Sequence, residues 1–164
     1  MSPTDAIIAE RPEAEQPAPT DRPVVNTRFG DFTYDPARII AMPQGPIGYA
    51  DRHSFVFLNV PGAEDGPYKI FQSIDDPSLG FIVIPAATVD APIEHADKLA
   101  ACNYYHVAWE SAAFILIAVM RRDENGQART TVNLKAPLLV DVDNLWANQV
   151  VFTNNAYSVT AEIQ

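Results

Sequence analysis

The sequence predicts an all-β fold, mainly antiparallel, in a compact β-barrel-like domain with about one short helix. Apolar, β-branched and aromatic runs of about five residues recur along the chain, and this length favours strands over helices. Glycine or proline separates most of these runs. A composition with 48% hydrophobic and 20% charged residues is that of a globular domain with its own core.

The strand candidates share this composition and end at turn-forming residues. We expect strands over residues 28–34, 38–42, 55–60, 68–74, 81–84, 114–120, 128–134, 138–140, 149–153 and 157–163. Residues 141–148 are predicted to form a connection. Strands at this spacing, without an apparent internal repeat, favour a barrel or a sandwich.

The clearest local prediction is a long β-hairpin formed by residues 114–120 and 128–134. Asn125 and Gly126 lie between these two runs. This pair is preferred in two-residue type I′ turns, in which both residues have positive φ. The sequence therefore predicts a tight turn at these two positions.

One segment, residues 92–103, has a helical pattern. Its apolar residues are spaced by three or four positions, and Pro92 stands at an early position. Glu94 and Asp97 fall in the first turn, where acidic side chains favour the helix dipole. We expect a single short helix here.

The first 24 residues differ from the rest of the chain. They hold five of the 14 prolines and little large aliphatic surface, so they cannot bury enough to offset their ordering entropy. We therefore expect a disordered, acidic, proline-rich tail over residues 1–24 and a β domain over residues 25–164. The tail contains five acidic and two basic residues, a net charge of −3, which leaves −7 of the chain's −10 on the domain.

This charge and the single cysteine restrict the function. An acidic surface with a pI near 4.5 repels phosphates, so we expect no direct nucleic-acid binding. The same charge would attract a basic protein, although it would also serve solubility alone. Cys102 has no partner for an intrachain disulfide, which fits a reducing compartment. The longest apolar run, residues 112–120, is too short to cross a membrane. With no secretory signal in the sequence, we expect a cytoplasmic protein.

Motifs for catalysis or cofactor binding are missing from the sequence. It holds no nucleophile elbow, glycine-rich phosphate loop or dinucleotide fingerprint. The three histidines, His53, His95 and His106, have no metal-ligand spacing. We therefore expect no catalytic residue, no metal and no cofactor.

Asp75 and Asp76 are the one exception to consider, because paired carboxylates can share a proton or hold a metal. A small β-barrel hydrolase or ligand-binding protein using this pair is one alternative. Adjacent strand residues point to opposite faces, however, and Asp-Asp-Pro after a strand is a common opening of a turn. The turn interpretation is favoured.

Four segments, read in order, resemble the bacterial flagellar assembly factor FliW family. The most specific is F-Q-S-I-D-D-P-S-L-G-F at residues 71–81, close to the family's L-Q-S-[VI]-[DE]-[DE]-P-x-[LI]-x-F. The other three are T-R-F-G at 27–30, M-P-Q-G-P-I-G-Y at 42–49 and N-L-K-A-P-L at 133–138. Within these motifs, Gln72 and Asn133 are amides in predicted strands, which we expect to tie strands to loops through hydrogen bonds.

The resemblance implies a noncatalytic flagellar assembly factor. FliW-like proteins bind flagellin and the RNA-binding translational repressor CsrA, and they antagonise the action of CsrA on flagellin messages. A chaperone-like factor that binds flagellin without a CsrA partner is the alternative closest to this. For the partner contact we single out Tyr49, Asp51, Asp75 and Asp76, which lie in or beside the family motifs.

Overall fold

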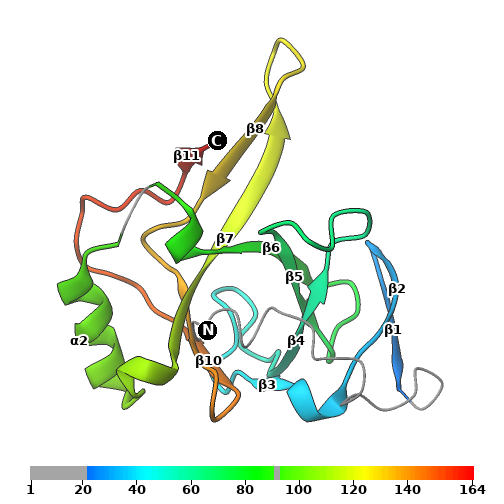
Figure 1. Ribbon diagram of the computed structural model, residues 1–164, viewed down its shortest axis with the longest axis horizontal. Coiled ribbons are helices and arrows are strands. Elements are labelled where there is room, and N and C mark those ends of the chain that lie inside the picture. The colour runs from blue at the N-terminus through cyan, green and yellow to red at the C-terminus, as the bar shows by residue number, and fades with distance from the viewer. Residues whose placement is uncertain (1–21, 91–92) are drawn as a thin grey trace.

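The computed structural model describes residues 22–90 and 93–164, and β-strands dominate this part of the chain (Figure 1). The strands are Val24–Thr27 (β1), Gly30–Thr33 (β2), Ile40–Ala41 (β3), Ser54–Asn59 (β4), Lys69–Ser73 (β5), Gly80–Pro85 (β6), Ala112–Arg122 (β7), Ala128–Val132 (β8), Leu138–Asp141 (β9), Trp146–Gln149 (β10) and Ala161–Ile163 (β11). The helices are His95–Tyr105 (α2) and the 3-10 turns Pro36–Arg38 (η3), Ala86–Thr88 (η4) and Trp109–Ser111 (η5).

Seven strands form a closed ring in the order β7-β6-β5-β4-β3-β10-β9, after which β9 pairs with β7 again. Every pairing in the ring is antiparallel except that of β3 with β10. β8 and β11 extend the sheet from β7, and β1 pairs with β2 in a separate hairpin. The predicted all-β, mainly antiparallel and barrel-like fold is confirmed.

β7 closes the ring because it pairs with β6 along one edge and with β9 along the other, and its length leaves room for β8 beside β9. Its first half pairs with β9, from Ala112 to Ile115, and its second half pairs with β8, from Ala118 to Arg122. Phe114 and Leu116 point into one hydrophobic core, and Ile115 points into another. Since both faces of this half of the strand are buried, its sequence is continuously apolar rather than alternating.

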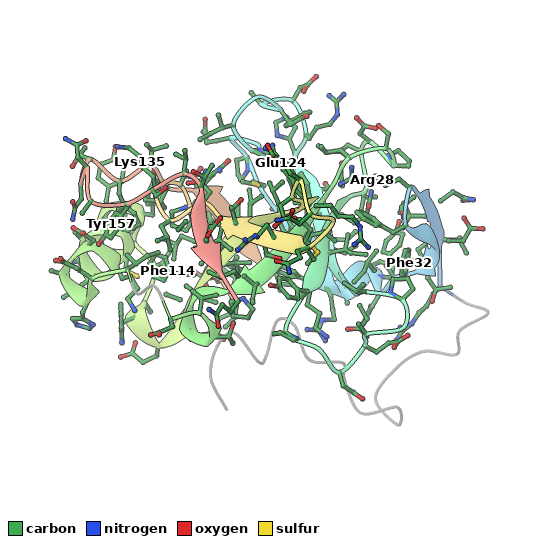
Figure 2. The ribbon with its side chains drawn as sticks, turned by 90° about the horizontal axis from the view of Figure 1, so that it is seen from above. Arg28, Phe32, Phe114, Glu124, Lys135 and Tyr157 are labelled. Atoms are coloured by element: carbon green, nitrogen blue, oxygen red, sulfur yellow. The ribbon has the colours of Figure 1, made fainter. Side chains whose placement is uncertain are left out.

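Among the residues that the structure describes, three hydrophobic cores hold the domain together. The core inside the ring takes a side chain from each ring strand; its largest fully buried members are Phe55, Phe71, Ile40, Met42, Ile115 and Leu138. A second core lies between the sheet and α2 and includes Phe114 and Tyr157, both on the α2 side in Figure 2. A third lies under the β1–β2 hairpin and includes Ile70.

β5 is buried along its whole length, although three of its five residues, Lys69, Gln72 and Ser73, are polar. Phe71 points into the ring, while Ile70 packs against the β1–β2 hairpin. Polar side chains on this strand therefore need internal partners. Lys69 has them: its ammonium donates to Asn59 Oδ1 at 2.8 Å and to the Glu64 carbonyl at 2.7 Å.

The predictions for the first strand and for the end of the tail were wrong. The predicted strand 28–34 is the turn and second strand of the β1–β2 hairpin, because Gly30 adopts φ +123° and reverses the chain. Val24, which the prediction placed in the tail, pairs with Thr33 in β1. The remainder of the predicted tail, apart from residues 22 and 23, lies outside the described residues.

The predicted hairpin 114–134 exists, but its predicted type I′ turn was wrong. Only Gly126 has positive φ, at +78°, whereas Asn125 does not. The Asp123 amide donates to the Gln127 carbonyl at 2.9 Å and closes a three-residue loop. Asp123 Oδ1 accepts the amides of Asn125 and Gln127, each at 2.9 Å. These side-chain bonds favour a type I turn followed by a left-handed glycine.

The predicted connection 141–148 also contains β10, which pairs with β9 from Trp146 to Gln149. The predicted strand 149–153 therefore begins earlier than expected, and its later residues form no regular strand. The predicted strand 157–163 is reduced to β11 at Ala161–Ile163.

The predicted helix is α2, His95–Tyr105, which begins later than expected and ends at His106 in the left-handed conformation with φ 57°. Tyr157 holds its first turn: the phenol donates to Asp97 Oδ2 at 2.5 Å and accepts the Glu94 amide at 2.9 Å. Burial and the neighbouring Asp97 raise the pKa of Tyr157, so this donor stays protonated. Within the described residues, no helix combines the length and the apolar character that crossing a membrane requires.

Candidate functional site

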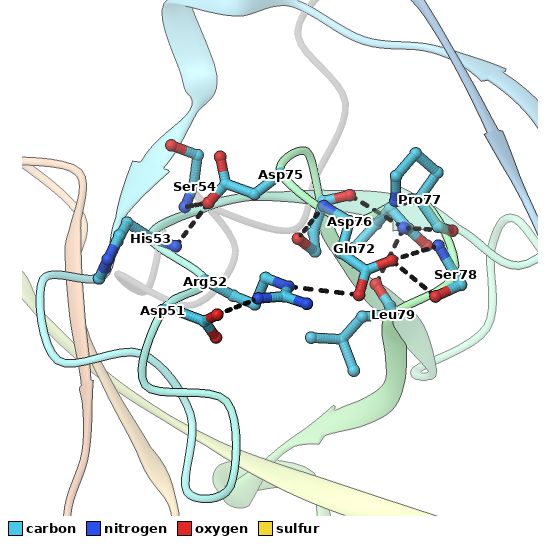
Figure 3. A network of polar contacts seen from close by, with 11 residues as sticks. Asp51, Arg52, His53, Ser54, Gln72, Asp75, Asp76, Pro77, Ser78 and Leu79 are labelled. Carbon is cyan, nitrogen blue, oxygen red and sulfur yellow. Dashed lines mark hydrogen bonds and ion pairs between the residues drawn. The ribbon is translucent and has the colours of Figure 1, made fainter.

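Two loops meet where β3, β4 and β5 run side by side. The first loop, residues 42–53, joins β3 to β4, and the second, residues 74–79, joins β5 to β6. The pairing of Phe55 with Ser73 places the start of β4 opposite the end of β5. The Ile74 amide then donates to the Ser54 carbonyl at 2.8 Å. This geometry brings Asp51 of the first loop and the adjacent Asp75 and Asp76 of the second into one network (Figure 3).

Asp75 joins the two loops through backbone hydrogen bonds. Its Oδ2 accepts the His53 amide at 2.6 Å and the Ser54 amide at 3.0 Å. Both amides belong to the end of the first loop, at the entrance to β4. The carboxylate of Asp75 therefore fixes the position of one loop relative to the other, and it does so as an acceptor.

Asp76 is held on the other side of the same turn. Its Oδ1 accepts the Ser78 amide at 3.1 Å and the Ser78 hydroxyl at 2.6 Å, and its Oδ2 accepts Arg52 Nε at 3.2 Å. The Ser78 hydroxyl and the Arg52 guanidinium lower the pKa of Asp76. A carboxylate held ionised is unsuited to act as a general acid near neutral pH.

The structure gives the carboxylates of Asp75 and Asp76 different hydrogen-bond partners. No group of three or more potential metal ligands occurs within residues 22–90 and 93–164. Both carboxylates bind groups that shape the loops, which favours the turn interpretation over the catalytic one.

Arg52 links Asp76 to Asp51, an exposed acid of the first loop. Its Nη1 lies 2.6 Å from Asp51 Oδ2, and the bonds to Asp51 and Asp76 raise the pKa of the guanidinium. The Asp51 side chain is 79% exposed, so most of its carboxylate faces solvent. We call the exposed parts of Tyr49, Asp51, Asp75 and Asp76 the acidic loop surface. Its three carboxylates outnumber the one guanidinium among them.

Gln72, in β5, holds the second loop through hydrogen bonds to its backbone. It is fully buried, and its Nε2 lies 3.0, 3.1 and 2.9 Å from the carbonyl oxygens of Ser73, Pro77 and Leu79. The prediction that this amide ties a strand to a loop is confirmed. Asn133 lies one residue after β8 and not in the predicted strand, and its Oδ1 accepts the amides of Lys135 and Ala136 at 3.1 and 3.0 Å within the following loop.

Gly80 leaves the space that Gln72 occupies. A Cβ at this position would lie 2.6 Å from Gln72 Oε1 and 3.2 Å from the Phe29 ring. We expect Gly80→Ala to lower the free energy of unfolding by about 1–3 kcal/mol through overpacking. Urea unfolding checks this value. In a Gln72→Ala background the same substitution should cost clearly less, because the closest contact is gone; equal costs in both backgrounds would contradict this explanation.

An exposed apolar side chain, Ile47, lies in the same loop as Asp51, and sequence reasoning missed it. Ile47 is 59% exposed, and Tyr49 in the same loop is 41% exposed. The Ile47 amide donates to Gln149 Oε1 at 2.8 Å, which joins the first loop to the end of β10. The Tyr49 ring packs edge-on against Phe81, with centroids 6.0 Å apart. The sequence holds no signal that distinguishes Ile47 from a buried apolar residue.

Comparisons with known proteins identify one family. Residues 23–163 match the model of the family described as FliW protein. The flagellar assembly factor FliW of Geotalea uraniireducens is 29% identical over 135 residues, which cover 82% of this chain and 80% of that protein. The flagellar assembly factor FliW of Caldanaerobacter subterraneus is 28% identical over 142 residues, covering 82% and 89% of the two chains.

A solved structure shows the same fold. The crystal structure of a flagellar assembly factor FliW aligns with a TM-score of 0.65 and 23% sequence identity, covering 85% of this chain and 96% of that one. The family match includes every strand of the ring and both loops of the acidic surface. The chain belongs to the FliW family of flagellar assembly factors.

Proposed function

We propose that this protein is a noncatalytic, cytoplasmic flagellar assembly factor that binds flagellin and a CsrA-like RNA-binding repressor where the cell has one. By binding the repressor, this protein would relieve the repression of flagellin messages. Flagellin would compete with the repressor for binding to this protein. Family membership supports the flagellar role. The acidic loop surface supports the contact with a basic partner, and this surface is the observation on which the proposal depends.

The chemistry of the acidic loop surface fits a protein partner better than a small substrate. Asp51 offers an exposed carboxylate, and the hydrogen bonds of Asp75 and Asp76 hold the loops in one arrangement before a partner arrives. Preorganised groups lose less entropy on binding. Tyr49 and Ile47 add exposed apolar area next to these acids. Acids beside apolar groups favour a partner segment that carries both basic and apolar side chains.

Isothermal titration of the full-length protein with flagellin and with the CsrA-like regulator, each at low and high salt, tests the proposal. We expect affinity for the basic regulator to fall as salt rises, because screening weakens attraction between exposed charges. Flagellin binding through apolar surface should depend less on salt. Binding to flagellin alone would support the flagellin-binding factor without CsrA, and binding to neither folded partner would refute the flagellar assignment of this chain.

Reversal of one exposed charge tests the location of the contact. We expect Asp51→Lys to weaken regulator binding roughly fivefold, because it replaces attraction with repulsion while leaving the Asp75 and Asp76 bonds in place. Asp65→Lys is the matched control, since Asp65 is also exposed and the change in net charge is the same. Equal losses in both variants would show that only the overall charge matters.

A further inference from the structure

The β7–β8 hairpin, which we call the arm, has a free strand edge. β6 pairs with β7 only as far as Ala118, which lies opposite Ile82. The next four residues, Val119 to Arg122, pair with β8 on one side, and no strand of the described residues pairs with their other side. Figure 1 shows the two strands projecting beyond the ring. A free edge of this kind presents unpaired backbone donors and acceptors to another chain.

The side chains along this edge are of two kinds, apolar and basic. Val119 is 43% exposed and Met120 is 51% exposed, and they are followed by the exposed residues Arg121 and Arg122. Two large apolar side chains therefore adjoin two cations. Edge strands that are protected against pairing carry charges or proline in place of apolar residues, so Val119 and Met120 are unusual at a protected edge.

Arg121 lies directly opposite Arg129 across the arm. Like charges in this arrangement repel each other. Arg129 is paired, with its Nε 3.1 Å from Asp123 Oδ2. Within the described part of the chain, no carboxylate pairs with Arg121, so an incoming carboxylate would both satisfy this cation and reduce the repulsion.

We propose that this edge of β7 accepts an extended segment of a partner protein as an added strand. The segment would carry two apolar residues next to two acidic ones, opposite Val119, Met120, Arg121 and Arg122. Backbone hydrogen bonds provide the general attraction in such complexes, and alternate side chains provide the specificity. The sign of the charge differs from that of the acidic loop surface, so this inference does not depend on the partners proposed above.

The test uses the full-length protein, labelled with ¹⁵N, and the peptide acetyl-Ser-Val-Ile-Glu-Glu-Ser-amide. We expect the peptide to shift the amide signals of Val119 to Arg122 and to slow their hydrogen exchange, as pairing of the edge requires. A second peptide with Lys-Lys in place of Glu-Glu should bind at least about fivefold more weakly, given the usual strength of exposed ion pairs. A third with proline in place of Ile cannot donate at that position and should also lose affinity.

Two protein variants and one control complete the test. Arg121→Gln and Val119→Thr should each weaken binding of the acidic peptide about threefold or more, since each removes one exposed contact and keeps the strand. Val24→Thr is the matched control: Val24 is 57% exposed in another strand, and binding should be unchanged. Equal binding of the acidic and basic peptides would overturn the proposal. So would shifts confined to other surfaces, or unchanged affinity in both variants.

Discussion

Replacement of Phe71 by alanine is expected to lower the free energy of unfolding by about 3–5 kcal/mol, the largest loss for any single side chain inside the ring. Phe71 is fully buried. Its ring stacks on Phe55 with centroids 4.4 Å apart and an interplanar angle of 3°, and it lies 5.0 Å from Phe57. Removal of this ring would leave a cavity that neighbours held by three paired strands cannot easily fill.

Urea unfolding monitored by circular dichroism measures this loss. Tyr104→Ala is the control, because Tyr104 is 76% exposed and its removal should change the free energy of unfolding by no more than about 0.5 kcal/mol. If Phe71→Ala cost as little as Tyr104→Ala, Phe71 would not hold the ring together.

The ring strands could be predicted from sequence because their signals are local. Residues 55–60 and 81–84 are short apolar runs between turn-forming residues, and they match β4 and β6 closely. Closure of the ring could not be predicted in the same way. It depends on β7 pairing with β6 along one edge and with β9 along the other, contacts between distant segments that hydrophobic spacing along one strand does not encode.

The turn of the arm shows how a local signal can mislead. Asn125-Gly126 is the preferred type I′ pair, but Asp123 lies two residues earlier and accepts hydrogen bonds from two loop amides. These bonds hold Asn125 at negative φ and leave only Gly126 in the left-handed region. A side chain outside the predicted turn thus selected a longer loop over the two-residue one.

The candidate site was partly readable from sequence. Tyr49, Asp51, Asp75 and Asp76 were singled out through the family motifs, and the structure places the three acids in one network. Their role in partner binding stays a prediction. Ile47 lies inside one of the motifs but was not singled out. An exposed apolar residue has the same sequence signal as a buried one, and only the fold distinguishes them.

Gln72→Met should have the second largest effect, on both the second loop and partner binding. Methionine fits the buried site in size but donates no hydrogen bond, so the Ser73, Pro77 and Leu79 carbonyls lose a shared donor. We expect the free energy of unfolding to fall by roughly 1–3 kcal/mol. Because this loop positions Asp75 and Asp76, affinity for the basic regulator should fall as well, by more than Asp51→Lys alone produces.

Two measurements separate the stability effect of Gln72→Met from the binding effect. Urea unfolding gives the first, and titration well below the unfolding midpoint gives the second. Gln127→Met is the matched control, because Gln127 is exposed in the arm loop and only its backbone takes part in the loop's hydrogen bonds. Faster amide exchange at Ser78 and Leu79 in Gln72→Met would show that the loop has loosened. If affinity for the regulator stayed unchanged while these amides exchanged faster, the partner would bind elsewhere than at the acidic loop surface.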